Sequence, residues 1–129
     1  MKPKPISTDQ APKAVAAYSQ AVEANGLIFL SGQIPLDPAT GALVEPDITV
    51  QTKRVMDNLH AVLAAANSDF DHVLKATIYL VDINEFAKVN DVYASYWKGD
   101  YRPARVTIAV SALPRGARVE IEMLAIPAT

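Results

Sequence analysis

Residues 73–81 constrain the fold most, because their β-branched and aromatic side chains favour a strand and both alternating faces of that strand are apolar. Such a pattern predicts a strand covered on both sides of its sheet. Residues 27–30 are apolar at every position and predict the same. The chain has only two helical patterns, and two helices can cover one face. We therefore expect further copies of the chain to cover the other face in an obligate homo-oligomer.

A hairpin and a long helix precede this segment. Asn25-Gly26 tolerates the positive φ angles of a two-residue turn, so residues 18–23 and 27–31 are predicted to pair as antiparallel strands. Pro46-Asp47 is typical of a helix start, and Asn67 is suited to the left-handed residue that follows a helix. The apolar stripe between them predicts one buried helix face: Ile48, Val55, Leu59, Val62, Leu63 and Ala66.

A second helix and two strands follow. The helix is predicted over residues 86–97, with Gly99 at its C-terminal cap and its apolar stripe on Phe86, Val89, Tyr93, Tyr96 and Trp97. The last strands are predicted over residues 105–112 and 117–126. The resulting order, β-β-α-β-α-β-β, predicts a single α+β domain over residues 1–129, with a mixed sheet and two helices on one face.

The short link from Leu113 to Gly116 predicts that the last two strands pair with each other as an antiparallel hairpin. Centring the turn on Pro114 and Arg115 places Arg105 opposite Leu124, Thr107 opposite Glu122 and Ala109 opposite Glu120. In this register one face carries Arg105, Thr107, Glu120 and Glu122. The other face, expected beneath the helices, carries Val106, Ile108, Val110, Val119, Ile121 and Met123.

Composition excludes several classes of protein. The 129 residues contain no cysteine, so disulfides, thiolate nucleophiles and thiolate metal sites are excluded. A net charge of −2 disfavours a strongly basic nucleic-acid binder. The basic N-terminus is not followed by the apolar region of a signal peptide, and the longest apolar run, Ala61–Ala66, is too short to span a bilayer. We expect a cytoplasmic protein that binds neither membrane nor nucleic acid.

Familiar catalytic motifs are absent, including GxGxxG, the Walker loop, GxSxG and HExxH. His60 and His72 are isolated in the sequence and are expected at the surface, and Asp69 and Asp71 are expected in a solvated loop. We predict neither a metal nor a cofactor.

Arg105 and Glu120 remain as candidate site residues on a sheet face that is expected to be covered. A guanidinium binds a small carboxylate through two parallel hydrogen bonds, and a neighbouring carboxylate can hold and activate water. A structural ion pair between subunits explains the same two residues equally well. From the residues alone, the prediction is an interface site for a small anion.

At these positions the chain resembles the RidA family, the reactive intermediate deaminases formerly called YjgF. The resemblance rests on motifs spread over almost the whole chain: Tyr18-Ser19-Gln20-Ala21, Phe29-Leu30-Ser31-Gly32-Gln33-Ile34-Pro35, Thr40-Gly41, Gln51, Asn58, Lys75, Asp82-Ile83, Phe86, Asn90, Tyr93, Pro103-Ala104-Arg105, Leu113-Pro114 and Val119-Glu120-Ile121-Glu122. It implies a chorismate-mutase-like fold, assembled as a homotrimer with sites between subunits.

The resemblance also implies an activity. Family members with the arginine hydrolyse enamine and imine intermediates, such as 2-iminobutanoate and 2-iminopropanoate, to 2-keto acids and ammonia. They need no cofactor, and this activity serves metabolite damage control. Arg105 would grip the substrate carboxylate, Glu120 would position the attacking water, and Tyr18 would steer the imine. Binding contacts would come from Ser31, Gly32, Asn90 and Thr107.

The chain departs from the family pattern at three places. Ala16-Ala17 replaces a usual Gly-Pro before Tyr18, Asn67 replaces a frequent Gly, and Thr107 replaces a frequent Cys, which excludes a thiol mechanism here. Three other functions stay open: a non-enzymatic 2-keto-acid-binding protein, a catabolic deaminase of a larger enamine, and the endoribonuclease of the family's older label. The net charge and the lack of a basic stripe argue against the last.

Overall fold

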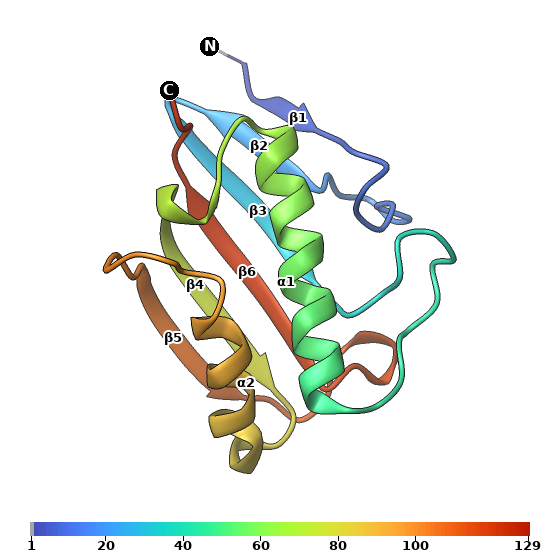
Figure 1. Cartoon of the computed structure of the whole chain (residues 1–129). Coiled ribbons are helices and arrows are strands. Elements are labelled where there is room, and N and C mark those ends of the chain that lie inside the picture. Colours follow the sequence, from blue (N-terminus) through green and yellow to red (C-terminus); the bar gives the residue numbers. More distant parts are fainter. Residues whose placement is uncertain (1) are drawn as a thin grey trace.

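Six strands form one mixed sheet, and two helices pack on one of its faces in the computed structural model, which describes residues 2–129 (Figure 1). The sheet order is β1-β2-β3-β6-β4-β5. The predicted α+β class and the placement of both helices on one face are confirmed. The strands are β1 (Lys4–Ile6), β2 (Ala21–Ala24), β3 (Leu27–Gln33), β4 (Val73–Leu80), β5 (Ala104–Ala109) and β6 (Val119–Ala125).

Strand β1 pairs with β2 at the edge of the sheet and was not expected from the sequence pattern. Pro5 and Lys4 lie in this three-residue strand, and proline within a run weakens any strand prediction. An edge strand tolerates proline because one side of its backbone needs no partner.

The predicted hairpin is confirmed. Asn25 and Gly26 have φ angles of 53° and 76°, and they join β2 to β3 by the kind of turn that suits twisted strands. The first strand begins at Ala21, not at Tyr18, so Tyr18 lies in the preceding loop.

Helix α1 (Ile48–Ala65) is confirmed at both ends. The Asp47 carboxylate accepts a hydrogen bond from the Val50 amide at 3.0 Å, which caps the N-terminus. Asn67 has a φ of 59°, and the Ser68 amide donates to the Leu63 carbonyl at 2.9 Å, the pattern of a Schellman ending. All residues of the predicted apolar stripe are buried.

Helix α2 (Phe86–Ala94) is shorter than predicted. Beyond Ala94 the amides of Ser95, Tyr96 and Trp97 donate three residues back, so the turn tightens while the apolar stripe continues. Trp97 is consequently still buried. The predicted cap at Gly99 is wrong, since Gly99 does not adopt a positive φ.

The predicted pairing of the last two strands is wrong. Strand β5 pairs in parallel with β4, placing Arg105 beside Ala76, while β6 lies antiparallel between β3 and β4, placing Glu120 beside Tyr79. The physical reason is the connection: α2 returns the chain over the sheet between β4 and β5, and a strand that follows such a crossover enters parallel.

The predicted faces are therefore correct for β6 and reversed for β5. Val119, Ile121 and Met123 are buried beneath the helices, and Glu120 and Glu122 lie on the uncovered face, as predicted. On β5, in contrast, Arg105 contacts residues of α2 on the helix side. Thr107 shares that side, and Val106, Ile108 and their neighbours of the same parity face the uncovered side.

The uncovered face of the sheet is apolar in part. Phe29 on β3 is 51% exposed there, and Val106 and Ile108 are exposed on β5, beyond the intervening strands β6 and β4. In a single chain these side chains meet solvent, as the prediction of further copies requires. No helix within residues 2–129 has both the length and the apolar character needed to cross a membrane.

Candidate functional site

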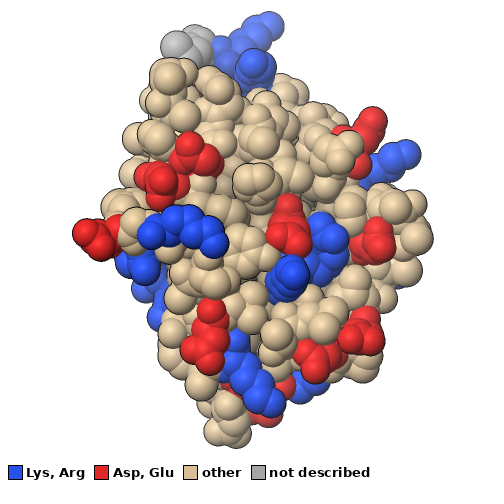
Figure 2. Space-filling model, in the orientation of Figure 1, with Lys and Arg blue, Asp and Glu red and all other residues tan. Residues whose placement is uncertain are grey.

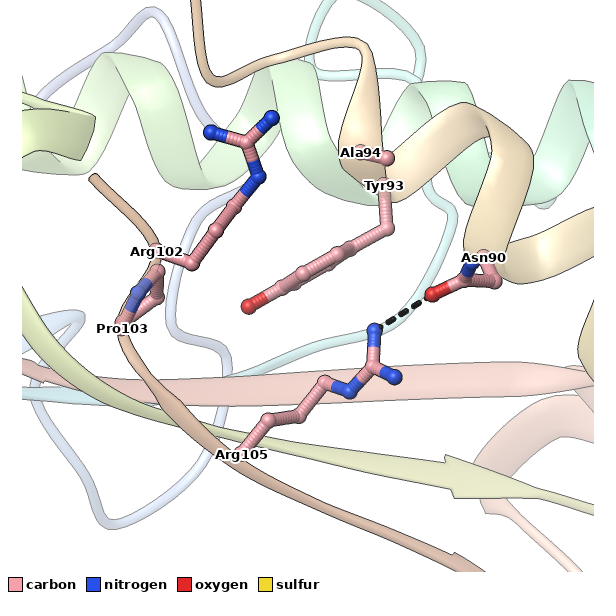
Figure 3. Close-up of a pocket in the computed structure, with 6 residues that line it drawn as sticks. All are labelled: Asn90, Tyr93, Ala94, Arg102, Pro103 and Arg105. Carbon is pink, nitrogen blue, oxygen red and sulfur yellow. Dashed lines mark hydrogen bonds between the residues drawn. The ribbon is translucent and has the colours of Figure 1, made fainter. Parts of the chain in front are cut away.

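Arg105 is held in place by α2. Its Nη1 donates to Asn90 Oδ1 at 2.7 Å, and its guanidinium carbon lies 5.3 Å from the Phe86 ring centroid and 5.1 Å from that of Tyr93 (Figure 3). Within residues 2–129 no carboxylate lies within 4.0 Å of this guanidinium. Arg105 is thus oriented without being neutralised, and its remaining N–H groups can donate to an anion.

A hollow of about 430 Å³ opens beside Arg105. It is lined by Asn90, Tyr93, Ala94, Arg102, Pro103 and Arg105. Asn90 and Arg105 are among the predicted site residues, whereas Tyr93 and Arg102 are not. Their spacing in the sequence could have indicated this position. Tyr93 follows Asn90 by about one turn of α2, and Arg102 lies just before β5, which carries Arg105.

Two hydroxyl groups on this side of the sheet are buried and have no hydrogen-bond partner within residues 2–129. They belong to Tyr93 and Thr107. Burial raises the pKa of Tyr93 to about 12, although the neighbouring Arg105 guanidinium works against this. Both groups are therefore neutral donors whose hydrogen bonds remain to be satisfied, and a bound ligand could accept them.

A second cluster forms around Glu120. The carboxylate of Glu120 lies against Gly32, where a methyl group would overlap Oε2 and come within 2.9 Å of Cδ. Gly32 belongs to an irregular stretch of β3, between Leu30 and Gln33, where the register shifts. The adjacent Ser31 hydroxyl donates to the Ser19 carbonyl at 2.6 Å and so joins this cluster to the loop that carries Tyr18.

The pKa of Glu120 is raised above its ordinary value, first by burial and then by the negative charge of Glu122. Tyr79 donates its hydroxyl to Glu122, and this hydrogen bond is the main cause of the raised pKa of Tyr79. A carboxylate with a raised pKa is a stronger base than an ordinary one and can take a proton from water.

Tyr18 is 51% exposed, and Gln20 fixes the loop before it. The buried Gln20 amide donates to the Pro12 carbonyl at 2.8 Å and accepts from the Thr8 amide at 2.7 Å. Gln20 is not among the predicted site residues. A polar residue beside the hairpin carries no sign in the sequence that it binds an irregular loop.

The predicted site residues thus fall into two groups. Arg105, Asn90 and Thr107 lie on the helix side of the sheet, and Glu120 lies with Gly32 and Ser31 on the other side. The prediction that Arg105 and Glu120 share one sheet face is wrong, because β5 pairs with β4 in a register that places Arg105 beside the buried Ala76, on the helix side. Within one chain the sheet separates these two groups.

The histidines and the loop carboxylates that were not predicted as site residues make local contacts. His60 is exposed and stacks on Phe70, with ring centroids 5.8 Å apart. His72 is half-buried and pairs through Nδ1 with Asp69 Oδ1 at 2.7 Å, so Asp69 is a contact residue and not only a loop carboxylate. No group of three or more His, Asp or Glu residues in the described part of the chain could hold a metal ion.

A family model described as Endoribonuclease L-PSP matches residues 8–127. The chain belongs to this family, the Rid proteins. It is 56% identical over 128 residues to Protein DfrA of Myxococcus xanthus, covering 98% of this chain and 97% of the relative. It is 46% identical over 123 residues to the 2-iminobutanoate/2-iminopropanoate deaminase of Mus musculus, covering 95% and 90%. A solved Rid-family structure from Yersinia pestis, described as a protein of unknown function, superposes with a TM-score of 0.95 at 50% identity, covering 97% of this chain and 99% of that chain.

Proposed function

We propose that this Rid protein is a cofactor-independent deaminase that hydrolyses 2-iminobutanoate and 2-iminopropanoate to 2-keto acids and ammonia. The state of Arg105 is the observation that carries the proposal. Its guanidinium is oriented by Asn90 at 2.7 Å, packed near two rings and free of any carboxylate in residues 2–129. These are the properties of a receptor for a small carboxylate. The name of the mouse relative supports the choice of substrate.

The active site is shared between copies of the chain. Arg105 and Glu120 lie on opposite sides of their own sheet, so a substrate bound by one cannot reach the other within the same chain. In a homotrimer, the uncovered face with Glu120 packs toward the neighbouring subunit and completes the site beside that subunit's arginine. The exposed Phe29 on this face supports such an assembly.

In the proposed reaction, Arg105 holds the substrate carboxylate so that the imine carbon is fixed in position. Glu120 takes a proton from water as the water oxygen bonds to the imine carbon and the C=N π electrons move to nitrogen. Protonated nitrogen then leaves as ammonia while the C=O double bond forms. The raised pKa of Glu120 suits it to accept and return these protons. Ser31, Gly32 and Thr107 shape the cleft, and Tyr18 steers the imine.

The charge pattern does not favour the endoribonuclease activity that the family description names. On the face covered by the helices, Lys and Arg alternate with Asp and Glu and form no continuous basic surface (Figure 2). Binding to RNA depends on such a surface, and the net charge of −2 does not supply one.

The direct test is a coupled assay in which a threonine dehydratase supplies 2-iminobutanoate and semicarbazide competes for it. We expect Arg105→Ala to lower kcat/KM by on the order of a hundredfold, because an unanchored imine is misplaced for attack. Arg115→Ala is the matched control, since Arg115 is exposed and its side chain bonds to the Gly41 carbonyl, at a position outside the hollow. Equal rates for the wild type and Arg105→Ala would refute the assignment. Binding of 2-ketobutyrate without any turnover would instead identify a keto-acid-binding protein.

A further inference from the structure

Arg102 is a second cationic group on the same hollow as Arg105. Its Nη1 donates to the Gly99 carbonyl at 2.7 Å and to the Tyr101 carbonyl at 2.8 Å, so the backbone holds the guanidinium. No carboxylate in residues 2–129 lies within 4.0 Å of it. Nε and Nη2 therefore keep N–H groups available to a ligand.

The two guanidinium groups lie on either side of the Tyr93 side chain (Figure 3). The Tyr93 hydroxyl is buried without a hydrogen-bond partner in the described chain, and the whole residue is only 4% exposed. Burial raises the pKa of this hydroxyl, and the positive charges of Arg105 and Arg102 lower it. Both guanidinium groups therefore act electrostatically at the position of the hydroxyl. The hollow thus offers two cations and one unsatisfied donor.

This lining exceeds what a monocarboxylic imine needs. One guanidinium suffices for the single carboxylate of 2-iminobutanoate, and the hollow has a volume of about 430 Å³. None of the residues that line it is acidic. A second positive charge without a counterion favours a ligand with a second negative charge. Because the Tyr93 side chain lies between the two guanidinium groups, the two negative charges of such a ligand would lie apart from each other.

We infer that Arg102 determines specificity, and that the site takes 2-imino acids with a second carboxylate at the end of the side chain. Arg105 binds the carboxylate next to the imine, Arg102 binds the distal carboxylate, and the Tyr93 hydroxyl donates to one of them. This inference rests on the proposed function for the role of Arg105. It adds dicarboxylic 2-imino acids to the monocarboxylic ones that the name of the mouse relative supports.

The test compares two product analogues of equal chain length, 2-ketoglutarate and 2-ketovalerate, which differ in the terminal carboxylate. Isothermal titration calorimetry with the wild-type protein is expected to show about tenfold tighter binding of 2-ketoglutarate, the strength of one exposed charge-assisted contact. Arg102→Ala should remove this preference and leave the 2-ketovalerate affinity within about twofold. Arg102→Lys should keep part of it. Arg115→Ala, which removes the same charge elsewhere, should keep all of it.

Equal binding of both ligands by the wild type would overturn the inference. So would an equal loss for both ligands in Arg102→Ala, which would indicate a structural role for Arg102. The outcome is distinguishable from that of the proposed function, because it is read from binding and not from turnover. A wild type that prefers 2-ketoglutarate but does not hydrolyse 2-iminobutanoate would refute the monocarboxylic deaminase and retain the diacid site.

Discussion

Gly32 lies so close to the Glu120 carboxylate that a single methyl group on it would displace that carboxylate. We predict that Gly32→Ala lowers kcat with 2-iminobutanoate by about a hundredfold, because a shift of about 1 Å misplaces the attacking water. Gly99→Ala is the matched control, since a methyl group there meets nothing within 4 Å and the backbone φ is not positive. Full activity in Gly32→Ala would show that the position of Glu120 does not matter for turnover.

The dependence of activity on pH should follow Glu120. A base works only when deprotonated, so kcat/KM should fall as the pH drops through the raised pKa of Glu120. Part of that rise is due to the charge of Glu122. Glu122→Gln should therefore move the midpoint of the acidic limb to lower pH. An unchanged midpoint, measured with excess coupling enzyme, would argue against Glu120 as the base.

Two substitutions of Asn90 separate orientation of Arg105 from its charge. Asn90→Ala removes the 2.7 Å hydrogen bond to Arg105 and should raise KM about tenfold, the value of one hydrogen bond to a charged group. Asn90→Asp retains the bond and adds a negative charge that competes with the substrate carboxylate. We expect the KM of Asn90→Asp to exceed that of Asn90→Ala. The reverse order would mean that Arg105 does not bind the carboxylate.

The uncovered sheet face should govern assembly. Phe29 is 51% exposed there, and Phe29→Lys would place a charge in the proposed subunit interface. We predict that sedimentation velocity shows a trimer for the wild type and a smaller species for Phe29→Lys, with loss of activity. Val50→Lys, on an exposed position of α1, should remain trimeric. A monomeric wild type at micromolar concentration would refute the shared site.

The left-handed residue after α1 gives a prediction about stability. Asn67 has a φ of 59°, which alanine adopts at a cost of about 1 kcal/mol. Asn67→Ala should lower the free energy of unfolding by about that amount, while Asn67→Gly should not lower it. Urea unfolding at one protein concentration provides the measurement. Both variants should retain wild-type turnover, because Asn67 lies outside the site.

Local signals in the sequence predict the local structure well. The turn at Asn25-Gly26 and the two ends of α1 depend on residues that act on their own stretch of backbone. These features can therefore be predicted without knowledge of the rest of the fold. Pairing between distant strands has no such local signal. The strand–helix–strand order around α2 indicates that β4 and β5 form a parallel pair, as observed. The short link at residues 113–116 instead favours an antiparallel pair of β5 and β6, and that prediction is wrong.

The face assignment of β5 failed for a related reason. Val106 and Ile108 are predicted beneath the helices because they are apolar, yet the uncovered face is apolar as well. Hydrophobic alternation tells one strand face from the other only where one of the two is polar. For β6, whose uncovered face carries Glu120 and Glu122, the same reasoning succeeded.

The crossover between β4 and β5 places the proposed anion-binding groups within residues 86–107, whereas Glu120 and its neighbours come from the hairpin and from β6. In the proposed reaction, recognition and water activation are thus encoded in separate stretches of the chain. A new substrate preference can arise by changes within the first stretch without disturbing the second. The fold can therefore diversify in what it binds while it keeps one way of reacting.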